Sequence, residues 1–505
     1  MQARAPDSAD SHAGWAPLLA ICLGTFMLLI DVTIVNVALP QMAVDLHTSF
    51  ASLQWVVDIY ALTLAALLMV IGSASDGVGR RRTYIAGLVV FTLASLVCGL
   101  APSEDVLVAA RAVQGAGAAA MFATTIALIN VAYTGRARGV AFGIWGATNG
   151  AAAAAGPIVG GLLTQGLSWR WVFFVNVPIG VATVVIGRRS LRESLREGPV
   201  RVDWPAGVAF TVAAGSATYG LLHAQSDGWT SPVTLSLLVL AVAALIGFVV
   251  REGHTRDPMF DLALLRGGPL AGVLVAATLY TAVAFAALIY TSIWLQTILG
   301  LSPVAAGLVT LPLSALSFVV AAAGGRVLHD IPARLVLVGG LLLLGVGDLL
   351  EIGLGGGSSW ARLLPGLAIL GIGVGAMSPV LASAAMSSVP TERGGMAAGA
   401  VNTARQLGFA LGIAILGGVF VSRIGDHLAG GPGHGRLADA AAGGGAQAAL
   451  AAAPPAARTH LDASLHVAVG SALGSTFAVA GIAGLAGAAL VWIMMRDPSR
   501  KSAAP

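Results

Sequence analysis

Three charged side chains lie inside the long apolar stretches in the first third of this 505-residue chain, namely Asp31, Asp58 and Arg111. A charged side chain at the centre of a membrane helix costs roughly 2.5–3.5 kcal/mol on insertion scales, so its presence needs a reason. Counting from the ends of these stretches puts all three about 9–12 Å below one membrane surface. A common depth favours one polar chamber, in which a carboxylate can exchange a proton.

Two interpretations of this chamber stay open. In the first, Asp31 exchanges a proton with substrate or solvent; in the second, a fixed aspartate–arginine pair only holds helices together. We expect proton coupling at Asp31. For Asp58 neither interpretation is preferred, because this residue lies closer to the membrane surface, where its carboxylate can stay hydrated.

The elements that position these residues are membrane-spanning helices. A bilayer core of about 30 Å needs about 20 helical residues, and that length divides the chain into fourteen apolar spans. The first six are predicted at 15–39, 53–72, 83–101, 105–129, 139–165 and 171–187. Two follow at 205–224 and 232–250, and six more at 270–295, 304–325, 334–353, 363–386, 396–421 and 466–495. Twelve spans are the alternative, since closely joined pairs can be miscounted.

The span map predicts three parts. Residues 1–187 form an N-terminal six-helix bundle, 188–267 a connector with two inserted transmembrane helices, and 268–505 a C-terminal six-helix bundle. Within the connector, the basic segment 188–204 is expected to be an interfacial helix. Near the outer end of the eleventh span, Asp348 and Glu351 are interpreted as snorkelling or mouth residues.

One long outer connector, residues 422–463, is rich in Gly, Ala and Pro. We expect a loop there, with a loose helical hairpin as the alternative. His427, His434 and His460 lie in it without the spacing of metal ligands, so no metal site is predicted.

The basic residues give the orientation of the map. Of the 27 lysines and arginines, 20 fall in segments on one side, five on the other, and Arg111 and Arg405 within spans. Because basic residues accumulate on the cytoplasmic side, both termini are predicted to be cytoplasmic. Lys501 is the one lysine in the chain, which fits a bacterium of high genomic G+C content and hence a bacterial cytoplasmic membrane.

The composition excludes several classes of protein. Hydrophobic residues make up 57% of the chain and charged residues 10%, against about a quarter in soluble domains. A soluble enzyme, a disordered chain and a nucleic-acid binder are therefore excluded. No HExxH, GxSxG or P-loop motif occurs, so we expect neither an enzyme nor a cofactor.

The fifth span repeats glycine largely every three or four residues and contains Pro157. Small residues let two helix backbones approach closely, and proline removes a backbone donor and bends the helix. This combination suits a hinge, whereas close packing alone explains the glycines but not the proline.

Six motifs, in order along the chain, carry a resemblance to a known family. They are Asp31–Pro40, Trp55–Tyr60, Gly72–Arg82, Arg111–Gly117, Gly156–Gly161 and Asn402–Gln406. With them the chain resembles the fourteen-span drug:proton antiporters of the major facilitator superfamily. The segment Gly325–Arg334 is similar to a degraded second copy of Gly72–Arg82, with His329 where the aspartate is expected.

The resemblance implies an all-α integral membrane protein with the major facilitator fold, in which two bundles alternate in opening a central cavity. It implies proton-coupled efflux of amphipathic organic compounds, cationic ones among them, with the proton gradient as energy source. The alternative is a dedicated metabolite or lipid exporter of the same fold. Protons, a small organic substrate and the bilayer are the expected partners of a functional monomer, with no nucleic acid.

The resemblance also assigns roles to residues. Proton coupling is expected at Asp31, Asp58 and Arg111, with Asp31 first. The residues expected to line the substrate cavity are Asn36, Trp145, Asn149, Asn402, Arg405 and Gln406. Those of the cytoplasmic gate are Gly72, Asp76, Gly79, Arg80 and Arg81, with Gly77 where arginine is usual. The exporter motif, expected to act as a hinge, consists of Gly156, Pro157, Gly160 and Gly161.

Overall fold

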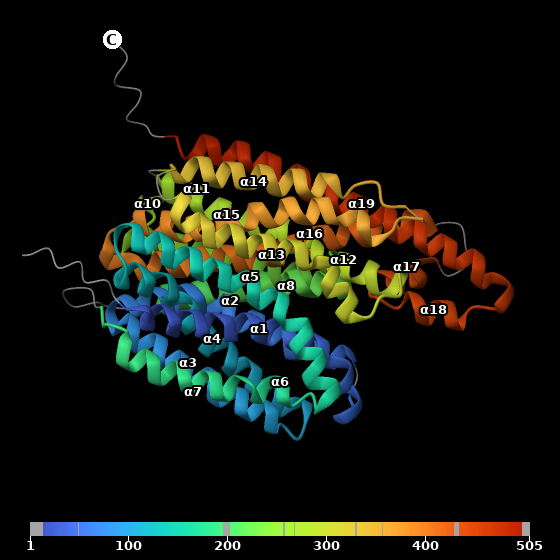
Figure 1. Cartoon of the computed structure of the whole chain (residues 1–505), viewed down its shortest axis with the longest axis horizontal. Helices are drawn as coiled ribbons and strands as arrows, with labels where there is room; N and C mark the ends of the chain where they lie inside the picture. Colours follow the sequence, from blue (N-terminus) through green and yellow to red (C-terminus); the bar gives the residue numbers. More distant parts are fainter. Residues whose placement is uncertain are drawn as a thin grey trace, which may run out of the picture.

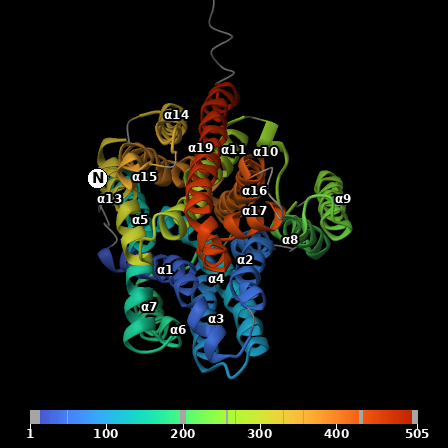
Figure 2. The same cartoon turned by 90° about the vertical axis from the view of Figure 1, so that its right-hand side faces the viewer.

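Long helices running side by side make up nearly the whole molecule (Figure 1). The structure is a computed structural model that describes residues 14–48, 50–194, 203–255, 258–266, 268–328, 331–355, 357–428 and 434–496. Figure 2 shows the helices of the first third of the chain gathered below those of the last half, with α8 and α9 at one edge.

The N-terminal helices correspond to the first six predicted spans. They are α1 (Trp15–Asp45), α2 (Phe50–Val78), α3 (Arg80–Leu100), α4 (Glu104–Ala132), α5 (Gly135–Gly166), the single turn α6 (Trp171–Phe174) and α7 (Asn176–Ser190). Next come α8 (Trp204–Asp227), which packs on α2 and α16, and α9 (Pro232–His254), which packs on α8.

The remaining helices form the second group. They are α10 (Ala263–Arg266), α11 (Pro269–Ala284), α12 (Ala287–Ile293), α13 (Pro303–Val327), α14 (Ala333–Leu350), α15 (Leu364–Ser387), α16 (Gly394–Leu428), α17 (His434–Ala442), α18 (Ala446–Ala452) and α19 (Pro455–Met494). A π-helical turn, η1 (Trp294–Ile298), continues α12, and two short 3₁₀ turns, η2 (Trp360–Leu363) and η3 (Thr391–Arg393), precede α15 and α16.

Twelve of the described helical segments are long and apolar enough to cross a membrane. The other two long helices, α5 with 32 residues and α8 with 24, are also long enough to cross. The helices are thus compatible with fourteen spans, since each predicted span overlaps one helix or a run of adjoining helical segments. The largest differences are at α19, which begins eleven residues before the predicted start at 466, and at α16, which ends seven residues after the predicted end at 421. The three-part domain division stays a prediction.

Both long connectors differ from the sequence-based expectation. Residues 422–463 are largely helical, because α16 continues to Leu428, α17 and α18 follow, and α19 begins at Pro455. The alternative of a helical hairpin therefore describes this segment better than a loop, as its alanine content favours. In the segment 188–204, α7 ends at Ser190, residues 191–194 are not helical, and residues 195–202 lie outside the described part.

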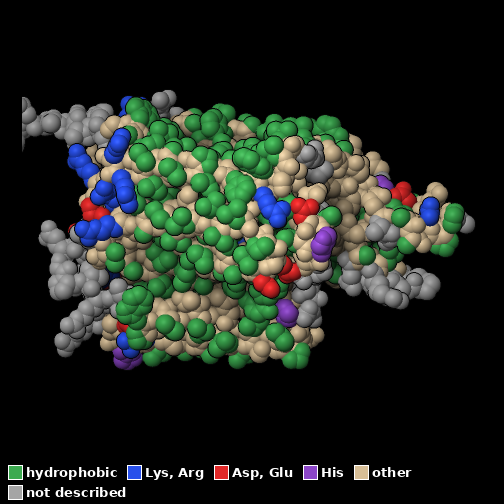
Figure 3. Space-filling view, turned by 90° about the horizontal axis from the view of Figure 1, so that it is seen from below, with side chains coloured by type: hydrophobic (Ala, Val, Ile, Leu, Met, Phe, Trp, Pro, Cys, Tyr) green, Lys and Arg blue, Asp and Glu red, His purple; other side chains and the backbone are tan. Residues whose placement is uncertain are grey.

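The surface of the helix assembly is that of a membrane protein. Apolar side chains cover its flank in Figure 3, while arginine side chains gather toward one end. Among the exposed large apolar residues are Leu93 on α3, Val239 on α9 and Val319 on α13. The end where α2 and α15 finish and α3 and α16 begin, which carries Arg80, Arg81 and Arg82, is termed the arginine-rich end.

Glycines set the closest helix contacts. On α5, Gly156 lies against Thr33 of α1, while a Cβ at Gly150 would come within 3.2 Å of the Ser314 carbonyl oxygen of α13. Because α1 belongs to the first group and α13 to the second, α5 lies between the two groups. Its glycines let both neighbours approach.

We predict that a glycine at the α3–α4 contact cannot be replaced by alanine without loss of stability. A Cβ at Gly117 would lie 2.6 Å from the Phe91 backbone nitrogen, and such overpacking costs about 1–3 kcal/mol. The matched control is Gly247 of α9, where a Cβ would meet nothing within 4 Å. Thermal melting of the detergent-solubilised protein should show a lower Tm for Gly117→Ala and an unchanged or higher Tm for Gly247→Ala. Equal melting of the two variants would contradict this.

Candidate functional site

A buried ion pair joins α1 to α4. Arg111 Nη1 donates to Asp31 Oδ2 at 2.6 Å, and the two side chains are 1% and 0% exposed. Two charges can leave water at acceptable cost only when each compensates the other and their remaining polar atoms are hydrogen-bonded. Two of the three residues predicted for proton coupling therefore lie in direct contact.

Neutral donors complete the surroundings of the Asp31 carboxylate. Its Oδ1 accepts hydrogen bonds from Gln114 Nε2 at 3.1 Å and from Asn176 Nδ2 at 2.9 Å. Asn176 Nδ2 also donates to Ser95 Oγ at 3.0 Å. Asp31, Ser95, Arg111, Gln114 and Asn176 are together termed the Asp31 network. It connects α1, α3, α4 and α7 through side chains alone.

Further contacts hold the guanidinium in place. Arg111 Nε donates to the Val56 carbonyl oxygen at 2.9 Å, and Nη1 also donates to Gln114 Oε1 at 2.7 Å. The Arg111 Cζ lies 4.1 Å from the centre of the Tyr60 ring, a cation–π distance. Since Val56 and Tyr60 belong to α2, the ion pair organises five helices of the first group.

Asp58, the third residue predicted for proton coupling, lies apart from this pair. It is partly buried on α2, and no described basic side chain forms an ion pair with it. Sequence reasoning missed Gln114 and Asn176, which donate to Asp31, and Ser95, which accepts from Asn176. For Gln114 the available signal was its position three residues after Arg111 on the same helix face.

The exporter motif on α5 packs beside Asp31. Gly156 lies against Thr33, and a Cβ at Gly160 would come 2.9 Å from Ile34 Cγ1. Gly161 faces the other way, toward Val304 of α13. The α5 backbone therefore touches α1 within one turn of the ion pair. The Pro157 side chain lies outside the described residues, and the hinge role of the motif stays a prediction.

Two of the residues predicted to line the cavity cross between the helix groups. Asn149 Nδ2 on α5 donates to Ser378 Oγ on α15 at 3.5 Å. Asn402 Nδ2 on α16 donates to the Phe122 carbonyl oxygen on α4 at 2.9 Å. Arg405, one turn beyond Asn402 on the same helix, is partly buried. These contacts bring α4, α5, α15 and α16 to one interface between the groups.

The other predicted cavity residues lie differently. Trp145 is fully buried, and its Nε1 donates to Thr25 Oγ1 at 3.0 Å, so it joins α5 to α1 and offers no open surface in this conformation. Gln406 is partly buried on α16. The side chain of Asn36 lies outside the described residues.

At the arginine-rich end, the predicted gate residues connect the two groups. Asp76 Oδ1 accepts from the Gly395 amide at 2.7 Å and Oδ2 from the Met396 amide at 3.0 Å, so the carboxylate caps the start of α16. Arg80 lies 2.8 Å from Asp76 and donates to the Thr391 carbonyl oxygen at 2.9 Å. We term these contacts the Asp76 latch.

The other gate residues support the latch. A Cβ at Gly72 would lie 2.6 Å from the Gly395 carbonyl oxygen, so only glycine allows α2 and α16 to meet here. Gly79 has φ of 112°, a left-handed conformation that favours glycine. The Arg81 amide donates to Glu193 Oε1 at 3.0 Å. In the degraded second copy, His329 and Asp330 lie outside the described residues.

The expectation for Asp348 and Glu351 is wrong. Both lie at the end of α14, as expected, but each residue is only 1% exposed. Both Asp348 carboxylate oxygens and Glu351 Oε1 lack a hydrogen-bond partner among the described residues. Gly347 of α14, Gly366 of α15 and Gly481 of α19 let these three helices pack closely. This close packing turns the two acidic side chains inward, so they do not snorkel to water.

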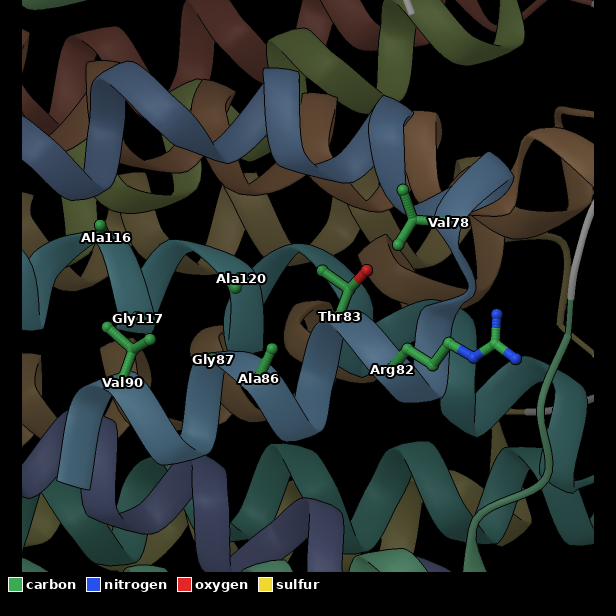
Figure 4. A pocket seen from close by; sticks show the side chains of 9 residues that line it. All are labelled: Val78, Arg82, Thr83, Ala86, Gly87, Val90, Ala116, Gly117 and Ala120. Carbon is green, nitrogen blue, oxygen red and sulfur yellow. The ribbon is translucent and has the colours of Figure 1, made fainter. Parts of the chain in front are cut away.

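A groove of about 350 Å³ opens between α3 and α4 near the arginine-rich end (Figure 4). Its lining is apolar except for Arg82 and Thr83, and none of the residues predicted for proton coupling or the cavity lines it. Within the described ranges, no three His, Cys, Asp or Glu side chains gather as metal ligands would. The residues predicted for proton coupling, the cavity and the gate therefore lie elsewhere, among them those of the Asp31 network, the group interface and the Asp76 latch.

Known proteins share this sequence and fold. Multidrug resistance protein Stp of Mycobacterium tuberculosis is 38% identical, over 80% of this chain and 75% of that protein. The Tetracenomycin C resistance and export protein of Streptomyces glaucescens is 36% identical, over 84% of this chain and 79% of that protein. Multidrug efflux pump LfrA of Mycolicibacterium smegmatis is 32% identical, over 95% and 96%.

A solved structure and a family model agree with these relatives. The human organic anion transporter MFSD10 superimposes with a TM-score of 0.59 over 93% of this chain and 99% of that one, at 14% identity, which supports the fold alone. The family model of the Major Facilitator Superfamily matches residues 21–413. With its membrane-crossing helices and a family match over most of its length, this multi-pass membrane protein belongs to the Major Facilitator Superfamily of transporters.

Proposed function

We propose that this protein exports small organic compounds from the bacterial cytoplasm in exchange for protons, by alternating access and as a monomer. The relatives described above are named for multidrug resistance, antibiotic export and drug efflux. The energy source is the proton gradient, and no cofactor takes part. The observation that carries the proposal is the Asp31 network, a carboxylate inside the membrane with a fixed arginine partner.

Protonation of Asp31 is the coupling step in this proposal. A proton on the carboxylate removes the charge that holds the Arg111 guanidinium, and so loosens the contact between α1 and α4. The same part of α1 touches Gly156 and Gly160 of α5. Because α5 also packs on α13 of the second group, a shift of α1 against α5 passes to the group interface.

The arginine-rich end is the cytoplasmic end in this proposal. Most basic residues belong there by the positive-inside rule, and α1 begins and α19 ends on that side. Both termini are then cytoplasmic. The Asp76 latch closes the cytoplasmic side, so the described conformation is one that binds no substrate from the cytoplasm.

A dedicated exporter of one metabolite is the second candidate. It is favoured by relatives named after single compounds, such as the Puromycin resistance protein pur8 of Streptomyces alboniger, which is 35% identical. A panel of chemically unrelated toxicants in an efflux-deficient host separates the two candidates. Resistance to several classes supports multidrug export, and resistance to one class supports the dedicated exporter.

We predict that Asp31→Asn abolishes proton-driven export. The amide keeps the shape of the carboxylate but carries no charge to compensate Arg111 and takes up no proton. In everted vesicles, substrate-induced collapse of an imposed proton gradient should fall by about tenfold or more. The matched control is Asp45→Asn, which removes an exposed carboxylate at the other end of α1 and should leave transport unchanged. Wild-type coupling in Asp31→Asn would refute the proposed step.

We predict that Asp76→Asn opens the arginine-rich end. The variant loses the ion pair with Arg80 and weakens the cap on α16. Hydrogen exchange followed by mass spectrometry should show faster exchange in peptides that cover residues 72–82 and 391–400. The control Asp261→Asn removes a partly exposed ion pair with Arg393 at the same end and should change exchange much less. Equal protection in Asp76→Asn and wild type would contradict the latch.

A further inference from the structure

The guanidinium of Arg405 makes no ion pair and no hydrogen bond with any described part of the chain. Its Cζ lies 5.3 Å from the centre of the Tyr280 ring on α11, and its backbone carbonyl oxygen accepts from Thr281 Oγ1 at 2.6 Å. Arg111, the other arginine within a membrane span, has a carboxylate at 2.6 Å. The two intramembrane arginines therefore differ in one respect, which is that only Arg405 is left without a counter-charge.

Arg405 lies near the middle of the membrane. It is eleven residues along α16 from Gly394, roughly 16 Å at the rise of an α-helix, in a bilayer core of about 30 Å. An ionisable residue at this depth is expected to have a partner. Since the chain provides none in its described residues, the partner is expected to come from outside the chain.

Two unused hydrogen-bonding atoms belong to residues that are connected with Arg405 along α16 or through Tyr280 and Ser378. Asn402, one turn away on α16, is 2% exposed, and its Oδ1 has no described partner. The Asn149 Oδ1 on α5 is also without one. The Tyr280 side chain interacts with Ser378, which accepts a hydrogen bond from Asn149. Asn149, Tyr280, Ser378, Asn402 and Arg405 are termed the cross-group polar set, because they line up from α5 of the first group to α16 of the second.

We propose that Arg405 binds an anionic oxygen group of the transported compound, a carboxylate or a phenolate on an aromatic body. The planar guanidinium presents paired N–H donors that match a carboxylate, and the Tyr280 ring holds one of its faces. The amide oxygens of Asn149 and Asn402 accept from hydroxyl or amide groups elsewhere on the compound. This inference rests on the proposed export function and specifies its substrate class.

The acidic side chains of the spans offer little to a cationic ligand, because most of them are paired or buried away from the group interface. Asp31 is 0% exposed and saturated by Arg111, Gln114 and Asn176. Asp348 and Glu351 are buried against α15 and α19, away from the group interface. Asp58 is the remaining acid, and it stands on α2 near the outer end. Since Asp58 is not a member of the cross-group polar set, the one described charge in that set is the positive charge of Arg405, which favours an anionic ligand over the cationic substrates expected from the sequence.

Transport of two dyes of similar size and opposite charge tests this. Everted vesicles from an efflux-deficient host are incubated with fluorescein, an anion, or with rhodamine 123, a cation, in the medium, and dye accumulation in the lumen is measured for wild type, Arg405→Gln and Arg405→Lys. We expect Arg405→Gln to lower fluorescein transport by about tenfold or more while rhodamine 123 transport stays or rises. Arg405→Lys keeps the positive charge but loses the paired N–H donors of the guanidinium, so its fluorescein transport should lie between those of wild type and Arg405→Gln. Arg423→Gln, an exposed arginine on the same helix, is the matched control and should behave as wild type.

A binding measurement guards against a variant that fails to fold. Fluorescence anisotropy of fluorescein on the purified protein should show a Kd raised by about tenfold or more in Arg405→Gln, with thermal melting as a check of folding. Unchanged fluorescein binding and transport in a folded Arg405→Gln would overturn the inference, as would a wild type that carries rhodamine 123 but not fluorescein. In both cases export itself stands. A wild type that carries neither dye and confers no resistance to acidic or cationic toxicants would instead overturn the export function, and this inference with it.

Discussion

The buried ion pair between Asp31 and Arg111 is the interaction on which the first helix group depends. Removing one partner from such a pair leaves a bare charge in the membrane interior and costs about 3–5 kcal/mol. Gln114, Asn176 and the Val56 carbonyl oxygen provide further hydrogen bonds to the pair. In the coupling step proposed above, a proton on Asp31 would remove the negative charge that compensates Arg111.

The second group is built differently. Its intramembrane arginine, Arg405, has only an aromatic ring beside it, and two amide oxygens nearby are unused. The buried arginine of the first group thus has its counter-charge within that group, whereas Arg405 has none among the described residues. If Asp31 couples protons and Arg405 binds the substrate, as proposed above, the two tasks lie in different groups, which α5 and α16 connect.

Much of this arrangement could be predicted from the sequence. Span positions follow from hydrophobic length, and the contact of Asp31 with Arg111 from their common depth. Asn176 was out of reach, because its partner is 145 positions away and only the packed fold brings α7 against α1. The burial of Asp348 and Glu351 was mispredicted for a related reason. Position along a helix gives depth in the membrane, but the facing glycines of α15 and α19 decide whether a side chain reaches water.

The Asp76 latch shows how such a molecule can close one side firmly and still open. Asp76 caps α16 through two backbone amides, so the contact combines a charge with the positive end of a helix dipole and requires no side chain from the second group. Gly72, Gly395 and Gly399 bring the helices close enough for this. Since the partners are backbone amides, the strength of the latch depends on how straight and how near α16 lies. If a substrate binds Arg405 as proposed, it acts on the helix whose start the latch holds, and substrate binding and gate opening would then share α16.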